Sequence, residues 1–357
     1  REVKEVVGDD GKTYRVGIIS LPKFYIDFEA YRRNDPNYKS TTRDVRLLLD
    51  SLKQEKVDAV VMDLRFNGGG SLQESIELTG LFIDKGPVVQ VRDTRNQVEV
   101  NSDREEGVAW DGPLGVIINR FSASASEIFA AAIQDYGRGI VLGSQSYGKG
   151  TVQSAIDMSR VISPTDRLLL KAKSANKDGA IPTGAPQFGQ INITLAKFYR
   201  ITGSSTQHKG VEPDIVFPSL YSAEKYGESS EPSALPWDQI KATDFVPIAT
   251  LKPVIAQLDK RHRARMDASP AYKFLLEDIE TMQRQETETS ITLQEDKLKQ
   301  EREEGRLKNK SRTEALQQMR INLPLGSGAA SNLEEGLDFI QEESLAVMAD
   351  YVALMRK

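Results

Sequence analysis

Short apolar runs separated by glycine turns fill roughly the first 220 residues. Residues 3–7 and 14–20 flank Asp10-Gly11, and this arrangement predicts a β-hairpin because Asp-Gly supplies the positive φ angles of a tight turn. Further apolar runs predict strands at residues 57–64, 88–92, 114–118, 140–142, 167–173, 191–200 and 214–217.

Three segments between these strands have apolar residues at helical spacing, at 42–54, 71–83 and 124–136. The second begins with Ser71-x-x-Glu74, which is a capping box. Strands that alternate with helices indicate an α/β domain. We therefore expect an α/β core over residues 1–220.

The character of the chain changes after residue 220. Residues 221–248 contain a polar stretch typical of a linker, and residues 251–320 are rich in both charges with Gly305 as their single glycine. This composition predicts an all-helical domain at 249–357, whose last helix opens with Ser331-x-x-Glu334. Residues 285–310 have few apolar positions and are expected to form an exposed helix or a connection.

Composition excludes several kinds of chemistry. The chain has no cysteine, so disulfides, thiolate nucleophiles and cysteine-based metal sites are excluded, and its only histidines are His208 and His262. The net charge of −5 gives no general attraction for nucleic acid or anionic lipid. We expect no metal or other cofactor, and the remaining chemistry falls to hydroxyls, carboxylates and lysine.

Residues 143–151 come close to a phosphate-binding P-loop. However, Gly150 replaces the hydroxyl residue that should bind magnesium, and the chain after Thr151 reads as extended where a P-loop needs a helix. A nucleotide-binding protein is therefore a remote alternative.

A second candidate site lies between a predicted strand and a predicted helix, where Ser122, Ser124 and Ser126 are closely spaced. Ser124-x-x-Glu127 is a capping box, yet a serine in the first turn of a helix also has the helix dipole and free backbone N–H groups beside its hydroxyl. The residues alone do not separate the three serines.

A lysine could serve as the base for such a serine, because burial disfavours the ammonium form. Lys149 is flanked by two glycines, which let the backbone pack closely around it. The glycine turn at residues 68–70 offers bare N–H groups for an oxyanion, or it is simply a tight strand-to-helix turn.

At this point the sequence resembles the C-terminal processing peptidases, a family of serine–lysine peptidases. The resemblance covers most of the chain and is carried by Val61-Met-Asp-Leu-Arg-Phe-Asn-Gly-Gly-Gly70, Asp111-Gly-Pro-Leu, the stretch from Arg120-Phe-Ser-Ala-Ser-Ala-Ser-Glu to Asp135-Tyr-Gly137, Tyr147-Gly-Lys-Gly-Thr-Val-Gln153 and Gly210-Val-Glu-Pro-Asp214. Residues 234–237 and the charged helical tail look like the C-terminal domain of the long tail-specific members.

The resemblance implies a role for each residue that matches the family pattern. Ser124 corresponds to the nucleophile, Lys149 to the general base, and Gln153 to the residue that orients the lysine amine. The oxyanion-hole positions are Gly70 and Ala125, and supporting positions are Glu127 and Asp135. The implied fold is a crotonase-like spiral of ββα units followed by helices. The PDZ domain usual in the family is not evident in this chain.

The resemblance further implies a periplasmic serine endopeptidase that acts on unfolded or tail-exposing proteins with apolar C-termini, and association with the inner membrane is part of this expectation. A helical-repeat lipoprotein adaptor and a homo-oligomer are its expected partners. The alternative is an inactive or PDZ-dependent scaffold of the same fold.

Overall fold

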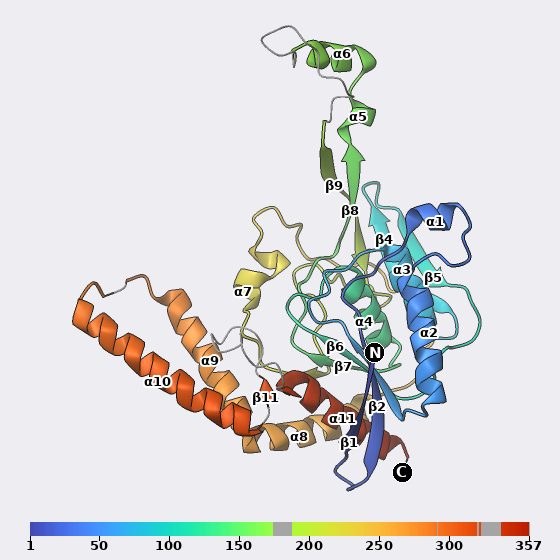
Figure 1. The fold of residues 1–357 in the computed structure, drawn as a ribbon. Coiled ribbons are helices and arrows are strands. Elements are labelled where there is room, and N and C mark those ends of the chain that lie inside the picture. Colours follow the sequence, from blue (N-terminus) through green and yellow to red (C-terminus); the bar gives the residue numbers. More distant parts are fainter. Residues whose placement is uncertain (174–187, 291, 320, 323–336, 357) are drawn as a thin grey trace.

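The computed structural model describes residues 1–173, 188–290, 292–319, 321–322 and 337–356 (Figure 1). A six-stranded sheet in the order β1-β2-β3-β6-β7-β10 forms the centre. Its strands are β1 (Glu2–Val7), β2 (Thr13–Ser20), β3 (Ala59–Asp63), β6 (Leu114–Ile118), β7 (Ile140–Gly143) and β10 (Ile215–Val216). The predicted hairpin pairs β1 with β2 in antiparallel register, whereas all other neighbours in this sheet run parallel.

Both faces of this sheet are covered, which explains the unbroken apolar run of β3. Val60 and Met62 pack into one hydrophobic cluster, and Val61 packs into the cluster on the opposite face. Helices α2 (Thr41–Gln54), α3 (Leu72–Gly80) and α4 (Ala125–Asp135) contribute to the first cluster. The short helix α1 (Phe28–Arg32) precedes them.

A second sheet has the order β5-β4-β9-β8 and is antiparallel throughout. It contains β4 (Gly86–Asp93), β5 (Val98–Asp103), β8 (Thr151–Asp157) and β9 (Gln190–Tyr199). Strands β8 and β9 extend away from the centre and lead into α5 (Met158–Val161) and α6 (Pro164–Lys173), so this arm stands clear of the body (Figure 1).

The predicted strand at residues 167–173 is wrong, because these residues belong to helix α6. Ser163 accepts from the Asp166 N–H at 3.1 Å, and its hydroxyl donates to the Asp166 carboxylate, which caps a helix that starts at Pro164. Apolar runs this short do not distinguish strand from helix. Strand β5 was not predicted.

The region after residue 249 is mainly helical, as predicted, with α8 (Lys252–Ala268), α9 (Pro270–Thr287), α10 (Glu295–Met319) and α11 (Phe339–Met355), but it also contains a small pairing of β11 (Ile321–Asn322) and β12 (Leu337–Asp338). The stretch predicted as a linker contains the short helix α7 (Ala223–Tyr226) and a 3-10 turn at Glu228–Ser230. Helices α9 and α10 project together from the body (Figure 1). The predicted cap at Ser331 lies outside the described residues, and α11 begins at Phe339 with Asp338 as its N-cap.

Helix α11 is part of the core of the strand domain. It packs against β2, β3 and β6, and its Leu345, Val347 and Met348 side chains are fully buried. The approach is close: a Cβ added at Gly115 of β6 would lie 2.7 Å from the Met348 sulfur. The α/β core followed by helices is confirmed, but the last helix completes the core instead of standing apart from it.

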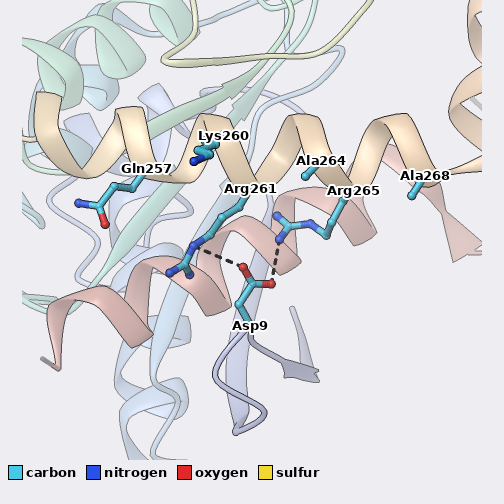
Figure 2. Close-up of a pocket in the computed structure, with 7 residues that line it drawn as sticks. All are labelled: Asp9, Gln257, Lys260, Arg261, Ala264, Arg265 and Ala268. Atoms are coloured by element: carbon cyan, nitrogen blue, oxygen red, sulfur yellow. Dashed lines mark ion pairs between the residues drawn. The ribbon is translucent and has the colours of Figure 1, made fainter.

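Helix α8 is attached to the turn of the first hairpin. Figure 2 shows Asp9 between two arginines of α8, with its carboxylate 3.3 Å from Arg261 Nε and 3.5 Å from Arg265 Nη1. Arg265 also pairs with Asp350 of α11 at 2.6 Å. A surface hollow of about 590 Å³ lies at this junction, and it includes none of the predicted site residues. No helix among the described residues is long and apolar enough to cross a membrane.

Candidate active site

Ser124 stands at the turn between β6 and α4, where it is the N-cap of the helix. Its φ of 58° is positive, which is uncommon for a residue with a side chain and is a strain usually found at functional positions. The serine is half-buried, so its side chain is partly accessible.

The neighbouring serines, Ser122 and Ser126, stabilise the local structure through hydrogen bonds. Ser122 and Ser126 are completely buried, and their hydroxyls donate to the Leu64 and Asn67 carbonyls, each at 2.8 Å. A buried hydroxyl that already satisfies a backbone carbonyl is not free to attack a substrate. Of the three serines, the structure therefore leaves Ser124 as the candidate nucleophile.

The glycine turn after β3 lies directly against Ser124. A Cβ added at Gly69 would lie 2.8 Å from the Ser124 Cβ and 3.0 Å from the Ala125 nitrogen. Gly70 has a φ of 147°, and a Cβ there would lie 2.0 Å from the Phe24 carbonyl oxygen. Glycine is therefore required at both positions by close contact as well as by backbone conformation.

Two backbone N–H groups at this contact have no hydrogen-bond acceptor among the described residues. Ala125 is the first residue of α4, where N–H groups lack an intrahelical partner. Within the part of the chain that the structure describes, neither the Ala125 N–H nor the Gly70 N–H donates a hydrogen bond. The two predicted oxyanion-hole residues thus lie on adjoining turns with donors available to an anion.

Asn67 fixes the shape of the glycine turn, a role that the sequence analysis missed. Its side-chain oxygen accepts from the Gly69 N–H at 2.9 Å, and its amide donates to the Leu21 carbonyl at 2.8 Å. The side chain is completely buried. An asparagine directly before three glycines was the available signal, because its short amide readily bonds backbone groups two residues further on.

Lys149 lies in the turn between β7 and β8. The side chain is half-buried, and its Nζ lies 3.4 Å from the Gln153 side-chain oxygen. Gln153 belongs to β8 and follows a bulge between Val152 and itself. Bulges re-aim side chains next to active sites. The structure therefore brings together the lysine and the glutamine that the sequence analysis paired.

Glu127 connects the serine turn to the lysine turn. One of its oxygens, Oε2, accepts from the Ser124 N–H at 2.8 Å and from the Lys149 N–H at 3.0 Å. These two backbone nitrogens are therefore no more than 5.8 Å apart. The other oxygen, Oε1, accepts from the Gly148 N–H at 2.7 Å and from the Ser146 hydroxyl at 2.6 Å.

The Glu127 carboxyl is fully enclosed, and burial raises its pKa to about 7 against the opposing effect of these four donors. It bonds backbone groups on both sides of the site, so it positions Ser124 and Lys149. Ser146, which the sequence analysis also missed, holds the arrangement further by accepting from the Val211 N–H at 2.7 Å.

Asp135, the other predicted supporting residue, lies at the opposite end of α4. Eleven residues at the helical rise place it about 16 Å along the axis from Ser124. Its carboxylate pairs with Arg200, with 2.6 Å between Oδ1 and Nη2. The structure therefore gives Asp135 a role in attaching α4 to the end of β9 and does not bring it to the serine.

The two histidines and the P-loop alternative can also be placed. His262 is buried in α8 against Glu343 and lies outside the site, whereas the His208 backbone N–H donates to the Gly148 carbonyl at 2.8 Å. Thr151 begins a strand and not a helix, which removes the geometry that a P-loop requires. The described residues contain no group of three histidine or acidic side chains arranged to hold a metal ion.

Comparisons with known proteins show the family to which the chain belongs. Residues 15–217 match the family described as peptidase family S41, and residues 221–353 match the C-terminal domain of tail specific protease. The tail-specific protease of Haemophilus influenzae is 38% identical over 267 residues, which cover 74% of this chain and 34% of that protein. The carboxy-terminal-processing protease of Bartonella bacilliformis is 34% identical over 48% of this chain and 34% of its own length.

Among solved structures, a photosystem II D1 C-terminal processing protease aligns with 60% of this chain and 45% of its own, at 24% identity and a TM-score of 0.43. The chain spans about a third of the length of the curated relatives it matches.

Proposed function

The chain belongs to peptidase family S41, and from this premise we propose that it is a serine endopeptidase in which Ser124 is the nucleophile and Lys149 the general base. The observation that carries the proposal is the shared acceptor Glu127 Oε2, which holds the backbones of both residues at one point. A nucleophile and its base must lie within reach of each other, and this constraint holds the backbones from which the two side chains extend close together.

The proposed reaction passes through an acyl-enzyme. Lys149, in its neutral form, takes the proton from the Ser124 hydroxyl, and the alkoxide attacks the peptide carbonyl. The N–H groups of Gly70 and Ala125 donate to the resulting oxyanion. Lys149 then protonates the leaving amine, and the acyl bond to Ser124 is hydrolysed by a water that the lysine deprotonates.

Gln153 orients the amine during these transfers, since its side-chain oxygen is the acceptor nearest to Nζ. The lysine is only half-buried in the structure, so a bound substrate would exclude further water from the amine. Exclusion of water favours the neutral amine that the reaction needs.

We propose that substrates bind as an extended chain along β8. This strand pairs only with β9 in the described part of the chain, so its other edge is free, and it carries Gln153 next to the site. An extended peptide can add to such an edge through backbone hydrogen bonds. The substrate class expected from the family resemblance, unfolded proteins with apolar C-terminal tails in the periplasm, is compatible with this mode of binding.

The test compares four variants on an unstructured protein with an apolar C-terminus, in EDTA and without ATP. Ser124→Ala and Lys149→Met should each lower kcat by at least about a thousandfold, as loss of a member of a catalytic group does. Ser233→Ala, at an exposed serine in a turn, and Lys209→Met are the matched controls, and they should retain parental activity. Lys209 is an exposed lysine whose amine lies 3.9 Å from the centre of the Trp237 ring.

The results of these assays distinguish the serine–lysine peptidase from the two alternative functions. Parental cleavage by both Ser124→Ala and Lys149→Met would refute the assignment of these residues. A folded parent that cleaves nothing would favour the inactive scaffold, and turnover that requires ATP and magnesium would favour a nucleotide-binding protein.

A further inference from the structure

Arg65 lies at the entry to the glycine turn, between two carboxylates from distant parts of the chain. Its Nη2 is 2.6 Å from Asp63 Oδ2, and its Nη1 is 2.7 Å from Asp338 Oδ2. The side chain is only 15% exposed. Burial works against its charge, but the two carboxylates outweigh burial and raise the pKa of Arg65. The guanidinium is therefore a permanent charge that requires both partners.

The turn that follows Arg65 is strained. Phe66 has a φ of 61°, a left-handed conformation that costs about 1–2 kcal/mol for a residue with a side chain. Such conformations persist only where neighbouring groups enforce them. On one side of the turn the Phe66 N–H donates to Asn119 Oδ1 at 3.0 Å. On the other side the Arg65 N–H donates to Asp63 Oδ1 at 3.0 Å and the Arg65 side chain pairs with Asp63 and Asp338, so these bonds also restrain the turn.

Asp338 divides its carboxylate between two tasks. Oδ1 accepts from the Gln341 N–H at 3.1 Å and so caps α11, whereas Oδ2 pairs with Arg65. The same side chain therefore fixes the start of the C-terminal helix and the start of the glycine turn. Because α11 is packed in the core, its first turn is a rigid reference point for the site.

We propose that Asp338 is a positioning residue for the oxyanion hole, acting through Arg65 on the turn that carries Gly70. The inference rests on the proposed function, because it assigns to Gly70 a role in catalysis. It gives the C-terminal domain a direct part in the geometry of the site: the domain holds one of the oxyanion donors in place.

The experiment uses Asp338→Asn in the full chain. Asparagine caps helices about as well as aspartate does, so the variant removes the negative charge that pairs with Arg65 and retains the cap. The matched control is Glu342→Gln, which removes an acidic residue from the same turn of α11, where Glu342 pairs with Lys4 of β1 at 2.7 Å. Asp338→Glu is the conservative variant, which restores the charge.

We expect Asp338→Asn, but not Glu342→Gln, to change three measured quantities: amide hydrogen exchange, kcat and the affinity for an oxyanion mimic. Amide hydrogen exchange of a peptide covering residues 64–71 should accelerate. The kcat should fall about fivefold with KM unchanged, a small part of the roughly hundredfold or more that loss of a whole oxyanion donor costs. Affinity for a peptide boronate, which mimics the tetrahedral oxyanion, should fall by a similar factor. Asp338→Glu should recover part of each effect.

Unchanged exchange in Asp338→Asn, or faster exchange with unchanged kcat and boronate affinity in an active protein, overturns the inference. Equal effects in Glu342→Gln also overturn it, since they would show a general loosening of α11. If the parent itself is inactive, the exchange measurement still decides whether Asp338 holds the turn, and the failure belongs to the proposed function.

Discussion

Replacing Glu127 with glutamine tests how the serine and lysine turns are held together. The substitution keeps the shape of the side chain but exchanges one acceptor oxygen for an NH2 group. At the position of Oε2 this group would face two backbone N–H groups, those of Ser124 and Lys149. At the position of Oε1 it would face the Gly148 N–H and the Ser146 hydroxyl, and the hydroxyl can reverse its role and accept. We expect the second orientation, with the Gly148 N–H left unpaired.

The cost follows from this count. One buried N–H without a partner costs roughly 1–3 kcal/mol. At about 2 kcal/mol, the melting temperature should fall by roughly 3 °C in a chain of this size, because the entropy of unfolding grows with chain length. Because the backbones of Ser124 and Lys149 also lose an ionised acceptor, kcat should fall about ten- to a hundredfold, in line with the cost of a misplaced reacting group.

The stability of the protein should also depend on pH through Glu127, and the direction of that dependence can be predicted. Burial raises the pKa of Glu127 to about 7, above its ordinary value of 4.5, so the folded protein holds this proton more tightly than the unfolded chain does. The stability that the protonated Glu127 contributes to the folded protein is fully present below pH 4.5 and is lost as the pH rises through about 7. The total loss of free energy of unfolding is roughly 3 kcal/mol. Glutamine does not titrate, so the difference in melting temperature between parent and variant should shrink from pH 5 to pH 8 and close almost completely, because the stability that the parent loses is about as large as the cost of the substitution.

Melting is followed by circular dichroism across this pH range, and kcat is measured on the same preparations. Asp135→Asn is the control, because it breaks the buried pair with Arg200 at the far end of the same helix. It should destabilise the protein and leave the kcat of the folded fraction unchanged. The reasoning is refuted if Glu127→Gln leaves both stability and kcat at parental values, or if Asp135→Asn lowers kcat as much.

Three further predictions concern the turns, the helices and the histidines. Gly70→Ala should abolish activity and lower stability, since its Cβ would lie 2.0 Å from the Phe24 oxygen; Gly68→Ala, with nothing within 4 Å, should do neither in the same kinetic and melting assays. Truncation after residue 250 should unfold the core, because it removes α11 and with it the buried Leu345, Val347, Met348 and Val352, each of which contributes about 1.5–3 kcal/mol when buried. A variant that joins Ala268 directly to α11 keeps this helix and should be tolerated better. A truncated chain that is folded by circular dichroism and still cleaves substrate would contradict this. The double variant His208→Asn with His262→Gln should keep the shape of the parental pH–rate profile, and asparagine suits the φ of 64° at position 208. If a folded double variant lost or shifted one limb of that profile, an imidazole would be acting as the base.

Much of the strand domain could be predicted from local pattern. The hairpin at Asp10-Gly11 and the buried strand β3 depend on neighbouring residues, so turn chemistry and apolar runs were sufficient. Helix α6 was predicted as a strand because a short apolar run has no decisive period. Helix α11 begins at Phe339 with Asp338 as its cap, and that start depends on the packed structure because the Asp338 carboxylate also pairs with the distant Arg65.

The candidate site, like the fold, could be predicted only in part from the sequence. Resemblance to a family selected Ser124 and Lys149, but the residues alone left Ser122 and Ser126 open. The structure separates them through burial, since both alternatives donate to backbone carbonyls more than 50 positions away. The shared acceptor at Glu127 depends on the fold bringing a helix and a distant turn together, and no local pattern encodes such a meeting.

The placement of α11 has a consequence for the order of events during synthesis. The sheet beneath it is complete in sequence once β10 has been made, yet one of its faces stays open until residues near 355 leave the ribosome. Contacts such as Lys4 with Glu342 join residues 338 positions apart, and pairings of that span form late because the closure of so long a loop must come first. The core is therefore expected to be completed late in synthesis, when α11 packs onto the sheet, and a chain that stopped before α11 is expected to lack the packed core on which the proposed site rests.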